Sequence, residues 1–90
     1  MSEMEIRLDG NAAAGELAEV FTAEMTTAVC VCGHCGSTAP IGATYLYTGG
    51  PGSVLRCSSC EGVVIRFARV RGQLMIDMAG VARLELPALQ

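Results

Sequence analysis

The sequence predicts a small, mainly-β (α+β) fold, an antiparallel sheet with one N-terminal helix. Three observations predict it. The chain has 90 residues, enough for one small domain that spans residues 1–90. From about residue 26 the apolar residues lie in short runs separated by glycine, which is typical of antiparallel strands. The chain also has 5 cysteines, four of them in two Cys-x-x-Cys pairs, and a core this small needs such a cross-link.

The N-terminal part predicts one amphipathic helix over about residues 9–21. Its apolar residues recur at steps of three and four, the spacing of one helix face. They are Leu8, Ala12, Ala13, Leu17, Val20 and Phe21. Asp9 or Asn11 supplies the N-cap. Gly15 weakens this helix by about 1 kcal/mol relative to alanine.

The remaining segment, about residues 26–86, predicts a ribbon and sheet of short strands. The expected strands are 26–31, 43–48, 53–56, 63–70, 74–78 and 81–86. Gly49-Gly50-Pro51-Gly52 and Arg71-Gly72-Gln73 have residues that adopt positive φ at little cost, so each is expected to close a hairpin.

The N-terminus has no positively charged start followed by an apolar run, so a secretory signal is not expected. No apolar run approaches the roughly 20 residues of a helical membrane span. We therefore expect a cytoplasmic protein with no membrane partner. In that compartment thiols stay reduced, and clustered cysteines more often bind metal than form disulfides.

The cysteine pairs predict a zinc ribbon that holds one zinc ion per chain. The expected ligands are Cys32, Cys35, Cys57 and Cys60. Each Cys-x-x-Cys turn places two thiolates on one side of the ion, and a glycine close behind each pair allows a tight turn. Structural zinc supplies about 10–16 kcal/mol of apparent binding energy, more than the net stability expected of so small a domain. Iron accepts the same four thiolates, but it is less favoured because few aromatic residues are present to pack around a redox centre.

Two further residues lie beside the predicted ligands. Cys30 precedes Cys32 by two positions, so on a strand both side chains lie on one face. We expect Cys30 to be a bystander, because a site with four cysteines is closed; a thiol or metal redox sensor is the alternative. His34 is expected to point into water, the alternatives being a ligand in place of a cysteine or a titrating group near the thiolates.

Several stretches resemble a family of short uncharacterised actinobacterial proteins with a zinc-ribbon (rubredoxin-like double-knuckle) core. They are Leu8-Asp9-Gly10-Asn11-Ala12-Ala13-Ala14-Gly15, Val20-Phe21, Met25-Thr26, the two cysteine pairs, and Pro51-Gly52-Ser53-Val54-Leu55-Arg56-Cys57. The resemblance covers about residues 8–86. It implies cytoplasmic zinc-binding proteins of unassigned role and matches the four predicted ligands; Cys30 departs from the usual pattern.

The residue inventory argues against an enzyme. The chain has 1 histidine, so no Ser-His-Asp or Cys-His pair is evident, and no second carboxylate is placed beside Asp77 for acid–base work. We expect a protein-interaction module that binds a protein partner or a second copy of itself. The alternative is a nucleic-acid-binding ribbon associated with transcription or translation. It would use Arg56, Arg66, Arg69 and Arg71, and the net charge of -3 disfavours it.

Overall fold

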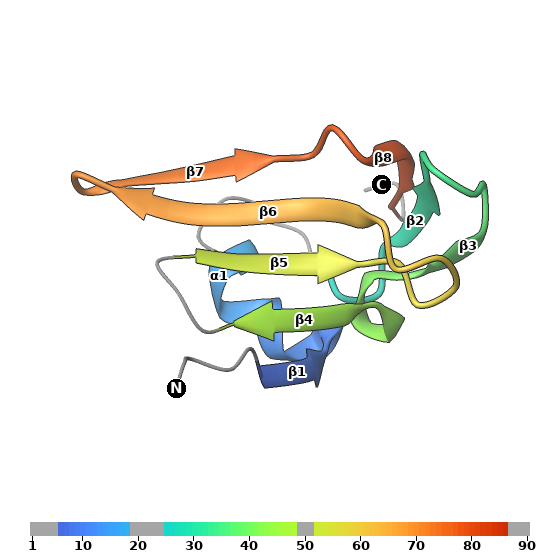
Figure 1. Cartoon of the computed structure of the whole chain (residues 1–90), viewed down its shortest axis with the longest axis horizontal. Coiled ribbons are helices and arrows are strands. Elements are labelled where there is room, and N and C mark those ends of the chain that lie inside the picture. Colours follow the sequence, from blue (N-terminus) through green and yellow to red (C-terminus); the bar gives the residue numbers. More distant parts are fainter. Residues whose placement is uncertain (1–5, 19–24, 49–51, 87–90) are drawn as a thin grey trace, which may run out of the picture.

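The computed structural model describes residues 6–18, 25–48 and 52–86, and they form two antiparallel sheets (Figure 1). The larger sheet has five strands in the order β1-β4-β5-β6-β7, and the smaller has three in the order β3-β2-β8. The strands are β1 (Ile6–Asp9), β2 (Val29–Cys32), β3 (Thr38–Pro40), β4 (Tyr45–Thr48), β5 (Gly52–Arg56), β6 (Val63–Val70), β7 (Gln73–Asp77) and β8 (Val81–Glu85). The mainly-β class is confirmed, but the single predicted sheet is divided in two.

The hairpins expected from the sequence are present. β4 pairs antiparallel with β5, and β6 pairs with β7 from Arg66–Asp77 to Val70–Gln73. In the second hairpin Arg71 and Gly72 have φ of 54° and 79°, the two consecutive positive values of a type I′ turn, which matches the twist of the strands. The predicted strand over residues 63–70 is confirmed at both ends.

The predicted N-terminal helix over residues 9–21 is wrong as a continuous element. The chain forms β1, then a 3₁₀-helix η1 (Gly10–Ala13) and a single turn of α-helix, α1 (Ala14–Ala18). The N-cap prediction is confirmed for Asp9, whose side chain accepts a hydrogen bond from the Asn11 backbone N–H at 3.1 Å. The last predicted residues, 19–21, lie outside the described part of the chain.

Close backbone packing explains why the segment does not form a regular helix at its start. Gly10 donates its N–H to the Thr44 carbonyl at 2.8 Å, and a Cβ at this position would collide with the Ile41 carbonyl oxygen. Thr44 follows the short 3₁₀-helix η2 (Ile41–Ala43). The contact therefore fixes the start of η1 against η2, a tertiary constraint that apolar periodicity does not reveal.

One face of the larger sheet carries the hydrophobic core. Leu46, Leu55, Ile65 and Phe67 alternate inward along β4, β5 and β6, and each is at most 2% exposed. Ala13 and Leu17 cover them from η1 and α1; Figure 1 shows these helices on one side of the sheet. No helix within the described residues has the length and apolarity of a membrane span.

The two sheets meet where three chain segments pass close together. Gly33 donates its N–H to the Gly80 carbonyl at 2.8 Å. A Cβ on Gly80 would overlap the Val63 carbonyl oxygen, so the two backbone segments are in direct contact. This junction brings the turn after β2 beside the turn before β6, and these are the segments that contain the cysteine pairs.

Candidate metal centre

The structure brings the four predicted ligands into one cluster. Their sulfur atoms all lie within 4.8 Å of one another. The two distances that cross between the pairs, Cys32 Sγ to Cys60 Sγ and Cys35 Sγ to Cys57 Sγ, are both 3.8 Å. A tetrahedron with metal–sulfur bonds of about 2.3 Å has edges of about 3.8 Å. The cluster therefore has the size that a tetrahedral thiolate site requires.

The two cysteine turns, or knuckles (residues 32–37 and 57–62), have matching backbone hydrogen bonds. In each, the first cysteine donates its N–H to the carbonyl five residues later and accepts at its carbonyl from the N–H four residues later. For Cys32 the partners are Ser37 and Gly36, and for Cys57 they are Gly62 and Glu61; the four distances are 2.8–3.0 Å. Backbone hydrogen bonds alone therefore close both loops.

The tight bend directly follows the second cysteine of each knuckle. Gly36 has φ of 79°, as the sequence predicts, but in the second knuckle Glu61 takes the positive φ of 64°. Gly62 serves a different purpose, because a Cβ there would lie 2.5 Å from Cδ2 of His34. The absent side chain of Gly62 leaves space for that ring.

Hydrogen-bond donors surround the sulfur atoms. Backbone N–H groups of His34, Ser59 and Gly62 point to Cys32, Cys57 and Cys60, each at 3.3 Å. Such donors stabilise sulfur in its thiolate form.

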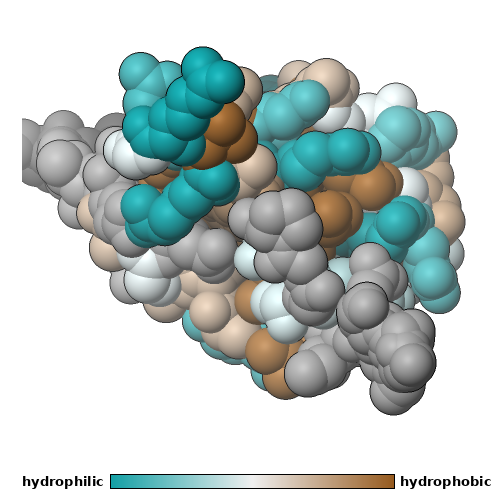
Figure 2. Space-filling model, turned by 60° about the vertical axis from the view of Figure 1, so that its left-hand side comes forward, coloured by the Kyte–Doolittle hydropathy of each residue, from teal (hydrophilic) through white to brown (hydrophobic). Residues whose placement is uncertain are grey.

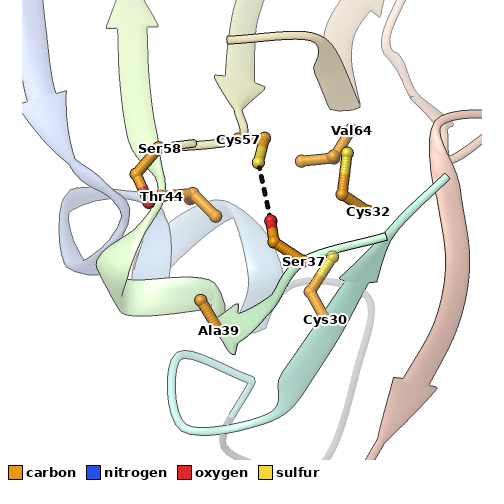
Figure 3. Close-up of a pocket in the computed structure, with 8 residues that line it drawn as sticks. All are labelled: Cys30, Cys32, Ser37, Ala39, Thr44, Cys57, Ser58 and Val64. Carbon is orange, nitrogen blue, oxygen red and sulfur yellow. Dashed lines mark hydrogen bonds between the residues drawn. The ribbon is translucent and has the colours of Figure 1, made fainter. Parts of the chain in front are cut away.

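Ser37 adds a side-chain donor that the sequence argument did not identify. Its hydroxyl lies 3.1 Å from Cys35 Sγ and 3.4 Å from Cys57 Sγ (Figure 3), and so contacts one ligand of each knuckle. The sequence signal for this role is the position of Ser37. It is the second residue after Cys35, as Gly62 is the second residue after Cys60.

The pKa values of the thiols follow from these contacts. Burial opposes ionisation of Cys57, but hydrogen bonds from the Ser37 hydroxyl and the Cys60 and Ser59 backbones outweigh it and lower its pKa to about 6. Ser37 also lowers the pKa of Cys35. The pKa of Cys60 is instead raised to about 11: the Gly62 N–H favours the thiolate, but burial and the neighbouring cysteines outweigh it. Thiolates packed this closely need a cation to coexist.

Cys30 lies beside the four-sulfur cluster and is not part of it. Its side chain lines a cavity of about 10 Å³ together with Cys32, Ser37 and Cys57 (Figure 3), a volume of about one water molecule. Burial, with repulsion from Cys32 and Cys57, raises the pKa of Cys30. A buried thiol with a raised pKa is a poor nucleophile, which argues against the redox-sensor alternative.

His34 is exposed but does not simply extend into water. Its Nε2–H donates to the Val63 carbonyl at 2.9 Å, so the ring connects the first knuckle to the start of β6. It is outside the metal cluster.

The arginines of the predicted patch do not all lie on one face of the larger sheet. Arg56 donates to the Glu61 carbonyl at 2.9 Å and lies 5.5 Å from the centre of the Tyr47 ring, and it thus braces the second knuckle. Arg66 and Arg69 are three positions apart on β6 and so belong to opposite faces of the sheet. The register places Arg66 on the same face as Tyr47. The nucleic-acid alternative placed all of these arginines in one binding patch. Their division between two faces of the sheet argues against a patch that includes them all.

Comparison with known proteins identifies a family and no function. Residues 2–89 match a family described as a family of unknown function, DUF6510. No curated protein and no solved structure matches the chain.

Proposed function

The chain belongs to DUF6510, a family of unknown function, and we propose that it is a zinc-binding protein whose ion is structural and whose surface serves as a protein-interaction module. The proposed ligands are Cys32, Cys35, Cys57 and Cys60. One ion per chain completes a zinc-ribbon core with two knuckles. The actinobacterial origin implied by the sequence resemblance stays a prediction.

The observation that carries the metal proposal is the geometry of the sulfur atoms. Two knuckles from different sheets present four sulfurs within 4.8 Å, and the distances across the knuckles equal the edge of a zinc–thiolate tetrahedron. Four cysteines packed for apolar burial alone would not need N–H donors on their sulfurs. Zinc is favoured over iron because the chain has few aromatic side chains, 2 Tyr and 2 Phe, to pack around a redox centre.

A structural role is favoured over a catalytic one. Zinc that acts in catalysis keeps one coordination position for water or substrate, whereas four cysteine ligands fill the tetrahedron. His34 lies outside the cysteine cluster, and its Nε2–H is engaged by the Val63 carbonyl. We therefore propose that the protein is not an enzyme and that the ion joins the two sheets at their junction.

The interaction role is supported by what the fold leaves uncovered. Val70, Met75 and Leu86 are exposed by 46%, 55% and 41%, and in the described part of the chain the outer strands of both sheets pair on one side only. A cytoplasmic location is part of this proposal, since it keeps five cysteines reduced for metal binding.

The test is native mass spectrometry with an absorption spectrum, recorded on the full chain purified without added metal. An acid-denatured sample supplies the mass of the chain alone. One colourless zinc ion per chain is the expected result. A coloured sample would identify the bound metal as iron, and the protein would then be proposed to transfer electrons. A folded chain without metal would overturn the proposal.

A further inference from the structure

Within the described residues, the outer edge of β7 has no strand paired with it. β7 is the last strand of the larger sheet, and Figure 1 shows it along one margin of the molecule, with the β6–β7 hairpin extending to one end. In Figure 2, which brings that end forward, hydrophobic side chains lie exposed among hydrophilic ones. An open edge with unpaired amide groups is a template for another strand.

The hairpin turn determines which amides face outward. A two-residue type I′ turn is closed by a hydrogen-bonded pair, here Val70 and Gln73. Hydrogen-bonded and non-hydrogen-bonded pairs alternate along an antiparallel ladder. The backbone groups of Met75 and Asp77 therefore face β6, and those of Leu74 and Ile76 face the open edge.

The two edge strands of the smaller sheet are better protected. β3 has three residues and includes Pro40, which has no N–H to offer. β8 carries Arg83 and Glu85, joined by an ion pair of 2.9 Å, and charged side chains discourage edge pairing. From Leu74 to Ile76, by contrast, β7 has no charge and no proline.

We propose that β7 pairs antiparallel with β7 of a second copy of this chain, about a two-fold axis at Met75. This rests on the proposed interaction role and names the partner. The arrangement uses both outward residues, because Leu74 of one copy then forms the hydrogen-bonded pair with Ile76 of the other. Met75, which is 55% exposed, lies opposite Met75 of the second copy. The two form a non-hydrogen-bonded pair, in which side chains are closest.

The ends of β7 are complementary in this register. Gln73 lies opposite Asp77 of the second copy, so an amide donor meets a carboxylate. The hairpin tip with Arg71 approaches the same acidic end, and antiparallel pairing repeats the match on both sides of the axis. Opposite charges across a strand pair stabilise it. A second copy thus fits the edge in hydrogen bonding, apolar contact and charge.

The test is sedimentation equilibrium of the zinc-loaded full chain across a wide concentration range, with the zinc content measured on the same samples. We expect a twofold rise in mass. Met75→Lys places two like charges at the axis and should weaken association about tenfold or more. Leu8→Lys is the matched control: Leu8 is also exposed, by 43%, but lies on β1, the opposite edge of the larger sheet, so this variant should still dimerise.

A second measurement separates edge pairing from packing of sheet faces. In the dimer, the amide protons of Leu74 and Ile76 should exchange with solvent more slowly as concentration rises, while those of Met75 and Asp77 change little. A zinc-loaded wild type that stays monomeric, or a Met75→Lys variant that dimerises like the wild type, would overturn the pairing and leave the metal proposal intact. A folded, metal-free protein would contradict the metal proposal separately.

Discussion

His34 Nε2 donates a hydrogen bond of 2.9 Å to the carbonyl oxygen of Val63, and this contact ties the first knuckle to the strand that leaves the second. The ring lies over Gly62, the last residue of the second knuckle. A residue between two candidate ligands thereby aligns the other pair without being a ligand.

Replacing His34 by alanine should lower the stability of the zinc-loaded protein. The net contribution of such a hydrogen bond is about 1 kcal/mol, which corresponds to a fall in Tm of about 4–8 °C for a domain this small. His34→Gln is the matched control, because its amide N–H can reach the same carbonyl and should restore most of the loss. Thermal unfolding followed by circular dichroism measures both; an unchanged Tm in His34→Ala would show that the contact contributes nothing.

Ser37→Ala should make the protein lose zinc at a higher pH. The Ser37 hydroxyl lowers the pKa of both Cys35 and Cys57, so its removal raises both values and lets protons compete better with the metal. Groups with lowered pKa values stabilise the folded state at high pH, and this contribution is lost as the pH falls. The midpoint of zinc release should rise by up to about one pH unit.

A zinc-responsive dye measures this release during acid titration. Ser59→Ala is the control, because Ser59 contacts Cys57 through its backbone N–H, which alanine retains. The wild type should hold zinc to below the Cys57 pKa of about 6, since the ion favours the thiolates further. Coincident curves for Ser37→Ala and the wild type would rule out the role assigned to the hydroxyl.

Cys30→Ala and Cys60→Ser should differ in metal content although both remove one thiol. Cys30 lies outside the four-sulfur cluster, so its variant should keep one zinc per chain and lose only a little core packing. Cys60→Ser removes a proposed ligand and should leave a largely unfolded chain, because the metal supplies most of the folding energy. Elemental analysis and circular dichroism decide this; zinc loss in Cys30→Ala would make Cys30 a ligand.

Local chemistry explains which features could be predicted from the sequence. The spacing of Cys32, Cys35, Cys57 and Cys60 indicated one cluster because each knuckle is a local turn. Strands such as β6 were predicted because a short run rich in β-branched residues lies between glycines, here Gly62 and Gly72. The hairpin between β6 and β7 followed from Arg71-Gly72-Gln73, because the conformation of a short turn depends on neighbours in sequence.

The features that could not be predicted depend on contacts between distant segments. The periodic apolar residues near Ala13 indicated a helix, but the close approach of Gly10 to Ile41 directs the chain into β1 and a 3₁₀ turn instead. The division into two sheets depends on the Gly33–Gly80 contact. Ser37 was missed because its role requires Cys57, 20 residues away in sequence.

Gly80→Ala should destabilise the junction of the two sheets more than any surface change. The added Cβ would overlap the Val63 carbonyl oxygen, and its next neighbours are also backbone atoms, so no side chain can rotate away. Backbone shifts of this kind cost about 1–3 kcal/mol, and here they also disturb the Gly33 hydrogen bond and the carbonyl that binds His34. We expect a fall in Tm of about 4–24 °C.

Gly15→Ala is the opposite case within the same chain. A Cβ there would meet nothing within 4 Å, and Gly15 lies in α1, so alanine should stabilise the protein by about 0.5–1 kcal/mol through the lower entropy of the unfolded chain. Thermal unfolding of both variants, each loaded with zinc, tests the junction directly. Equal Tm values for Gly80→Ala and Gly15→Ala would mean that the backbone contact at Val63 does not hold the two sheets together.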